Sequence, residues 1–232
     1  MSAWLIFLVI VAILGFIGYR TYGYYRQIRS GAVIELPQFN GKLSVVGGQA
    51  LPPATATTRA DVESDRSVSF GPDAANAKLV IVQFADFQCP YSKEESVVVR
   101  KLMQKYKDQV RFEFRDLPLD EIHHDAVPAA VAARCAHEQG KFWAYHDKLF
   151  VHSPTMTPTM LKDFGTEVGA DPVQFERCLL DQRYRGAVEA DRATAQRLGL
   201  IGTPTFFFNG RRVDGAIPED VFENLIQSML AQ

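Results

Sequence analysis

The fold of this chain is decided by one stretch, Phe84-Ala85-Asp86-Phe87-Gln88-Cys89-Pro90-Tyr91-Ser92-Lys93. An apolar run over residues 79–82 leads into it, and apolar residues at helical spacing follow it over residues 97–106. The pattern therefore places Cys89 where a buried strand ends and a helix begins. Unpaired N–H groups and the positive end of the helix dipole stabilise an anion at such a position. The sequence predicts that Cys89 reacts as a thiolate.

Length and composition favour one well-buried core with appendages. The chain has 232 residues, of which 47% are hydrophobic, and its net charge is −2. It is neither strongly basic nor striped with Lys and Arg, so we expect no nucleic-acid partner.

The N-terminal residues 1–19 are predicted to form a single membrane anchor. Residues 3–19 are uninterruptedly apolar, and this length matches the shortest membrane-spanning helices. The rival interpretation is a cleaved signal peptide. It is disfavoured because the apolar run is long, no basic segment precedes it and no small-x-small cleavage site follows it.

The orientation of this anchor is left open by two conflicting signals. Arg20, Arg26 and Arg29 follow the apolar run, and the positive-inside rule then keeps the C-terminal domain in the cytoplasm. A disulfide between Cys135 and Cys178, considered below, would instead place the domain outside the cytoplasm, tethered to a plasma membrane of bacterial type.

Residues 20–66 are predicted to be a flexible linker because they are rich in Gly, Pro, Ala, Thr and Gln without sustained periodicity. Strands and helices alternate from residue 67 onward. Strict alternation over 110–116 indicates a strand, so the order strand, helix, strand predicts a parallel β-α-β unit.

A helical block over about 126–198 follows this unit. Glycine and proline divide it into helices at 126–139, 141–151, 159–168, 172–180 and 183–198. Thr157 and Asp171 are placed to cap two of them. Strands at 205–208 and 212–213 then flank Asn209-Gly210, which indicates a type I′ hairpin, and an amphipathic helix covers 218–230.

This order of elements, together with three motifs, resembles the DsbA-like branch of the thioredoxin fold. The motifs are Cys89-Pro90-Tyr91, Gly202-Thr203-Pro204-Thr205-Phe206-Phe207, and the stretch from Ala133 to Trp143. The resemblance covers residues 67–232. It implies an α/β thioredoxin fold with a helical insertion.

The resemblance also implies roles for individual residues. Cys89 matches the family's nucleophile, and Pro204 matches its cis-proline, which leaves the backbone of Thr203 free to pair with an extended substrate. Pro90 and Tyr91 lie on the substrate-binding side, with Tyr91 the best exposed contact. From the residues alone, the favoured interpretation of Pro204 is an ordinary proline at the start of a strand.

Two positions depart from the family pattern. Ser92 stands where dithiol members carry the resolving cysteine, so Cys89 has no thiol partner within the motif. Gln83 stands where oxidase-type members bury an acid that handles protons for the second thiol. The two changes agree, because a buried carboxylate is unfavourable without a function that requires it.

The mechanism predicted from these residues is exchange through one thiol. Cys89 attacks a protein disulfide or a glutathione mixed disulfide, Ser92 donates a hydrogen bond to the thiolate, and an external thiol such as glutathione resolves the intermediate. No other cofactor is expected. One alternative is a degenerate module that binds peptides or a partner without turnover. Another, ranked lowest, is a kappa-type glutathione transferase, because the motif begins with Cys and a membrane tether does not fit that family.

The remaining cysteines, Cys135 and Cys178, lie on two helices of the predicted insertion. They form a structural disulfide if the domain occupies an oxidising compartment, as similar pairs do in some relatives. Otherwise they are small buried hydrophobic residues. In a third interpretation, one of these two cysteines is the resolving thiol that attacks the mixed disulfide formed at Cys89.

The histidines and the charged residues after the motif are predicted to have mainly structural roles. Adjacent His123 and His124 rarely converge on a metal, so we predict a solvated helix start and no metal site. His146 is interpreted as helix packing. Glu94 and Glu95 are interpreted as ordinary first-turn acids, and Lys93 as a cation that helps to hold the thiolate. The sequence predicts neither the natural substrate nor an oligomeric state.

Overall fold

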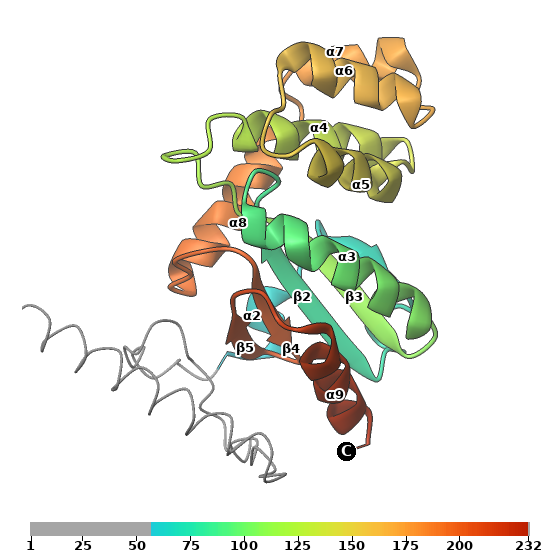
Figure 1. Cartoon of the computed structure of the whole chain (residues 1–232), viewed down its shortest axis with the longest axis vertical. Coiled ribbons are helices and arrows are strands. Elements are labelled where there is room, and N and C mark those ends of the chain that lie inside the picture. The colour runs from blue at the N-terminus through green and yellow to red at the C-terminus, as the bar shows by residue number, and fades with distance from the viewer. Residues whose placement is uncertain (1–56, 232) are drawn as a thin grey trace, which may run out of the picture. The chain divides into compact units, whose positions relative to one another are not determined.

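The computed structural model describes residues 57–231, and these form a five-stranded sheet covered by helices on both faces (Figure 1). The strand order is β1-β3-β2-β4-β5. The strands β2 and β3 are parallel, whereas the other neighbouring pairs are antiparallel. Their bounds are β1 Val68–Phe70, β2 Leu79–Ala85, β3 Val110–Asp116, β4 Thr205–Phe208 and β5 Arg211–Asp214.

The central strand β2 is buried on both faces, which explains its continuous apolar sequence. Its residues Leu79 and Ile81 pack with helices α3 (Pro90–Lys105) and α9 (Glu219–Leu230). Val80 and Val82 face the opposite way and pack with Ala195 of α8 (Arg185–Arg197). Helix α3 joins β2 to β3, which confirms the predicted parallel β-α-β unit.

The helical block forms an insertion between β3 and β4, as predicted. Helices α4 to α7 stack beyond the end of the sheet from which α3 starts (Figure 1). Thr157 and Asp171 each accept a hydrogen bond from the backbone in the first turn of the helix that follows. A disulfide between Cys135 and Cys178 joins α4 to α7. The remaining bounds are α4 Ala126–Glu138, α5 Phe142–His152, α6 Pro158–Glu167 and α7 Pro172–Leu180.

The structure differs from the sequence prediction in the segment before β1. Residues assigned to the end of the linker form helix α2 (Arg59–Val62), and Val62 is 1% exposed. The reason is a set of contacts with distant parts of the chain. The carbonyl of Val62 accepts a hydrogen bond from Arg115, and that of Arg66 accepts one from Arg134.

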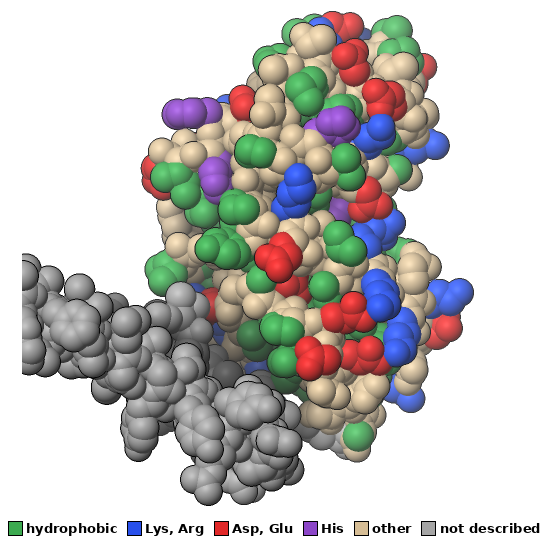
Figure 2. Space-filling model, viewed as in Figure 1, with side chains coloured by type: hydrophobic (Ala, Val, Ile, Leu, Met, Phe, Trp, Pro, Cys, Tyr) green, Lys and Arg blue, Asp and Glu red, His purple; other side chains and the backbone are tan. Residues whose placement is uncertain are grey.

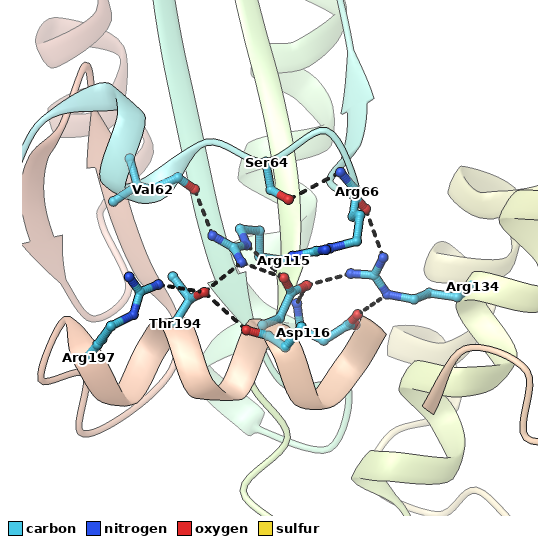
Figure 3. A network of polar contacts seen from close by, with 10 residues as sticks. Val62, Ser64, Arg66, Arg115, Asp116, Arg134, Thr194 and Arg197 are labelled. Carbon is cyan, nitrogen blue, oxygen red and sulfur yellow. Dashed lines mark hydrogen bonds and ion pairs between the residues drawn. The ribbon is translucent and has the colours of Figure 1, made fainter. Parts of the chain in front are cut away.

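These two arginines belong to a buried ionic network at the junction of β3, α4 and α8 (Figure 3). Asp191 of α8 accepts hydrogen bonds from Arg115 at 2.9 and 2.6 Å and from the backbone N–H of Asp116 at 3.1 Å. Arg134 of α4 pairs with both Asp116 and Asp191. The network therefore joins the segment before β1, the sheet and the insertion.

The predicted membrane anchor at 1–19 and most of the predicted linker lie outside the described residues. Within residues 57–231, no helix is both long and apolar enough to cross a membrane.

Candidate active site

Cys89 is the N-cap residue of α3, with Pro90 in the first turn, so the strand-to-helix junction lies where the sequence predicts it. Its side chain is 4% exposed. The backbone N–H of Cys89 bonds to the carbonyl of Asp86 at 3.2 Å, which closes the turn between β2 and α3. Its thiol donates a hydrogen bond to the carbonyl of Thr203 at 3.2 Å.

The segment opposite Cys89 is held by the chain that follows the β4–β5 hairpin. The peptide bond between Thr203 and Pro204 is cis. The carbonyl of Pro204 accepts a hydrogen bond from the N–H of Gly215 at 2.8 Å. The structure thus brings together Cys89, Thr203 and Pro204, which the sequence assigned to one site.

Ser92 is fully buried one turn into α3. Its hydroxyl oxygen accepts a long hydrogen bond, 3.5 Å, from the N–H of Asp86. Within the described residues, the hydrogen bond of the Cys89 thiol goes to Thr203 and not to Ser92. The predicted hydrogen bond from Ser92 to the thiolate therefore stays a prediction.

Asp86 organises the turn before Cys89, a role that the sequence reading missed. Its carboxylate accepts hydrogen bonds from the N–H groups of Gln88 and Leu119, at 2.7 and 2.8 Å. It also lies 2.8 Å from Nδ1 of His123. His123 thus contacts the active-site turn, which corrects the predicted solvated helix start at this residue.

Gln88 fixes the same turn to the insertion. Its side-chain amide donates to the carbonyl of Pro154 at 2.6 Å, and its side-chain oxygen accepts from the N–H of Asp125 at 2.7 Å. Because Asp86 and Gln88 both bond to residues of the 119–125 segment, the position of Cys89 depends on the insertion.

Glu95 is a buried acid and not the ordinary first-turn acid that the sequence reading made it. It is 1% exposed, and it accepts a hydrogen bond from the N–H of Ile217 at 2.8 Å. Burial raises the pKa of its carboxyl to about 7, although the Ile217 bond acts in the opposite direction. The reason for its burial is helical spacing, since Glu95 follows Ser92 by three residues and precedes Val99 by four on the buried face of α3.

Gln83 lies on β2, where it is 5% exposed, and its side-chain nitrogen has no hydrogen-bond partner within the described residues. Of the two positions compared, the one on the helix after Cys89 carries a buried acid, Glu95, and the one on the strand before it carries Gln83. Lys93 also departs from its predicted role, because its ammonium group donates to the carbonyls of Val151 and Ser153 at 3.3 and 2.8 Å.

Two exposed hydrophobic residues lie close in the sequence to Cys89 and Thr203. Tyr91 is 63% exposed, as expected for a substrate contact, and Ile201 just before the Thr203 segment is 76% exposed. Hydrophobic side chains gather where α3 begins, whereas charges of both signs alternate towards its end and over α9 (Figure 2). This distribution suits a partner that presents an uncharged, extended chain to the sulfur.

A family model described as Thioredoxin matches residues 66–228. The chain belongs to the thioredoxin family. Its fold is that of the DsbA-like thiol-disulfide oxidoreductases. The thiol-disulfide exchange protein α-DsbA2 of Wolbachia pipientis superposes with a TM-score of 0.66 at 19% identity, over 73% of this chain and 90% of that one.

Two thioredoxin-like proteins of known structure are more similar in sequence. A periplasmic protein from Salmonella enterica serovar Typhimurium is 27% identical, with a TM-score of 0.62 over 75% of this chain and 95% of that one. An oxidoreductase from Silicibacter pomeroyi is 25% identical, with a TM-score of 0.66 over 75% and 99%.

A curated relative of the thioredoxin domain occurs within a larger protein. The Na(+)/H(+) antiporter NhaA 3 of Salinispora tropica is 36% identical over 170 residues, which are 73% of this chain and 26% of the antiporter. The chain therefore spans about a quarter of the length of that relative.

The other candidate residues lie away from the thiol. Cys135 and Cys178 are bonded to each other, so neither is a free thiol that could resolve Cys89 in this form. His146 is 1% exposed and packs edge-on against Phe87 and Phe114. Within residues 57–231, no group of three His, Cys, Asp or Glu side chains is arranged to hold a metal.

Proposed function

We propose that this protein is a thiol-disulfide oxidoreductase that acts on protein disulfides, or on glutathione mixed disulfides, through Cys89 alone. The observation that carries the proposal is the position of Cys89. Its sulfur lies at the start of α3 against the carbonyl of Thr203, and Ser92 occupies the next turn. A helix start stabilises a thiolate, and no second thiol is available in the motif to end the reaction internally.

The exchange has two balanced steps. The Cys89 thiolate attacks one sulfur of the substrate disulfide, which forms a mixed disulfide and releases the other sulfur as a thiolate. A glutathione or protein thiolate then attacks the substrate sulfur of the mixed disulfide and releases the Cys89 thiolate. When the resolving thiolate belongs to the substrate itself, the result is isomerisation with no net transfer of electrons. When it is glutathione, the external thiol is the reductant: the sulfur that Cys89 captured leaves as a disulfide with glutathione, and the sulfur released in the first step leaves as a thiol.

The Thr203 segment is proposed to bind the substrate backbone, with Pro90, Tyr91 and Pro204 around it. Tyr91 follows Cys89 by two residues and Ile201 precedes Thr203 by two, and both side chains are exposed, which supports binding of an extended apolar chain. The Silicibacter pomeroyi oxidoreductase, at 25% identity, supports the redox activity.

We further propose that residues 1–19 tether the domain to the outer face of a bacterial plasma membrane. The Cys135–Cys178 disulfide and the periplasmic Salmonella relative support this location, whereas Arg20, Arg26 and Arg29 oppose it. Alkylation of thiols in cells before lysis tests it, because protein in the cytoplasm would carry free Cys135 and Cys178.

The exchange itself is tested with the full-length chain and a glutathionylated peptide. We expect a Cys89–glutathione adduct by mass spectrometry, peptide release, and regeneration of the free thiol on addition of glutathione. Cys89→Ser is the matched control and should form no adduct. Stoichiometric peptide binding with no adduct in the wild-type chain would replace the enzyme with the binding-module alternative.

A further inference from the structure

We infer that Glu95 is a positioning residue that holds the Thr203–Pro204 segment against Cys89. The inference rests on the proposed function, because it gives a buried acid outside the motif a part in the chemistry of Cys89. Burial of a carboxyl group is energetically unfavourable. Glu95 lies on the inner face of α3 and is 1% exposed, so it destabilises the fold unless its contacts compensate for the lost hydration.

The contacts of Glu95 close a ring that begins and ends on α3. One carboxyl oxygen accepts the hydrogen bond from Ile217, 2.8 Å away. Two residues earlier, the N–H of Gly215 bonds to the carbonyl of Pro204 at 2.8 Å. The neighbouring carbonyl, that of Thr203, accepts the hydrogen bond from the Cys89 thiol.

The geometry of this ring explains how Glu95 acts on a sulfur that it does not touch. Six residues of helix separate Cys89 from Glu95, which is about 9 Å along the axis. Helix α3 also packs against Phe206, Phe208 and Ile217 in one hydrophobic cluster, and the hydrogen bonds of Cys89 and Glu95 add a polar contact at each end of this interval. Without the Glu95 hydrogen bond, the 215–217 stretch that holds the Pro204 carbonyl loses its polar contact with α3.

A simpler role for Glu95 would be to stabilise the start of α9, since Ile217 precedes Pro218, the N-cap residue of that helix. The two roles differ in how far the effect of a substitution reaches. If Glu95 serves only α9, its substitution loosens residues 217–230. If it positions the Thr203 segment, its substitution also loosens that segment and increases the accessibility of Cys89.

The test uses three variants of the full-length chain. Glu95→Met keeps the volume of the side chain and removes the acceptor, and Glu95→Gln keeps an oxygen that can accept from Ile217. Glu94→Gln is the matched control, because Glu94 is the exposed neighbour and loses the same charge. Each variant is followed by amide hydrogen exchange and by the rate at which iodoacetamide alkylates Cys89.

We expect Glu95→Met to speed amide exchange about tenfold both at 215–217 and at 202–206, and to speed alkylation of Cys89 by a similar factor. In Glu95→Gln, the amide exchange rates and the alkylation rate should both lie within about threefold of the wild-type values. Glu94→Gln should change neither rate. Faster amide exchange confined to 215–230 with unchanged alkylation of Cys89 would overturn the inference. A Glu95→Gln variant whose exchange and alkylation rates equal those of Glu95→Met would overturn it as well.

A second measurement covers the case in which Glu95→Met does not fold. In the wild-type chain, native-state exchange should give the amides of Ile217 and Phe206 the same free energy of opening, whereas independent opening would contradict the ring. Neither measurement needs turnover. A wild-type chain that fails to exchange disulfides but shows coupled opening would leave the positioning role intact and remove the proposed function.

Discussion

The Cys89 thiol and the Thr203 carbonyl, joined by a 3.2 Å hydrogen bond, connect positions 114 residues apart in the sequence. The contact exists only while the sulfur carries its proton, because a thiolate can accept hydrogen bonds but cannot donate one. A thiolate at Cys89 would therefore lack this hydrogen bond to Thr203 when it acts as the nucleophile.

Ser92→Cys should convert the protein from an exchanger into a dithiol oxidase. The new thiol would lie three residues after Cys89 on the same face of α3, so the two sulfurs can bond. We expect the oxidised variant to form an internal disulfide and to pass it to a reduced peptide. Thiol titration after treatment with oxidised glutathione measures this. A variant that retains two free thiols would contradict the expectation.

Asp191→Asn should destabilise the fold by about 3–5 kcal/mol, because buried Arg115 loses the carboxylate that it pairs with, while Arg134 keeps its pair with Asp116. The loss is measured by urea unfolding. Asp120→Asn is the control, since its pair with Arg192 is partly exposed and should contribute less than about 1 kcal/mol. Equal losses for the two variants would show that burial does not determine the energetics.

Glu95 should make the free energy of unfolding fall as pH rises. Its pKa increases from 4.5 to about 7 on folding, so the folded chain binds more protons than the unfolded chain across that interval. The stabilisation present at pH 4.5 is lost by about pH 7. Glu95→Gln should remove this slope and be about 3 kcal/mol more stable than the wild type at pH 8.

The control for this pH dependence is Glu94→Gln, which should keep the slope because Glu94 is exposed. Denaturant unfolding between pH 4.5 and 8 provides the curves. Parallel curves for the wild type and Glu95→Gln would mean that the carboxyl is as acidic in the folded chain as in water.

The double variant Cys135→Ser with Cys178→Ser should lower the free energy of unfolding by about 2–5 kcal/mol, because the disulfide restricts the unfolded chain. The two cysteines are 43 positions apart and join α4 to α7. Chemical denaturation with and without reductant measures the effect. Reductant should shift the wild-type curve and leave the variant unchanged, and the opposite pattern would be inconsistent with a disulfide.

Thr203→Val should raise the free energy of unfolding by about 1 kcal/mol. The Thr203 hydroxyl is buried without a hydrogen-bond partner within the described residues, and the methyl group that replaces it has a similar shape. The bond from Cys89 goes to the backbone carbonyl, which the substitution keeps. Thermal unfolding is the measurement, and a lower melting temperature would reveal a partner for the hydroxyl.

The fold was predictable where its elements are long and periodic, or short but clearly bounded, as residues 205–208 are by Pro204 and Asn209-Gly210. The strand 110–116, the helix 172–180 and the strand 205–208 were predicted with the bounds that the structure gives. Helix α2 and strand β1 were missed, since four and three residues carry too little periodicity. Their positions depend on Arg115 and Arg134, whose acceptors lie more than fifty positions away.

The site was predictable only as far as its motifs reach. Cys89, Thr203 and Pro204 could be grouped by resemblance, but the sequence does not show that Asp86 contacts His123 or that Glu95 contacts Ile217. One local signal could have revealed Glu95. The apolar positions Leu102 and Val99, extended backwards at helical spacing, reach Glu95 and Ser92 before Cys89.

The two outer strands of the sheet, β1 and β5, are only three and four residues long. β5 also carries the charged residues Arg211, Arg212 and Asp214. Short, charged edges offer little template for another chain, so the sheet is poorly suited to growth by strand addition. A protein proposed to bind extended substrate chains at the backbone of Thr203 therefore offers those chains little opportunity to pair with the outer strands of its sheet.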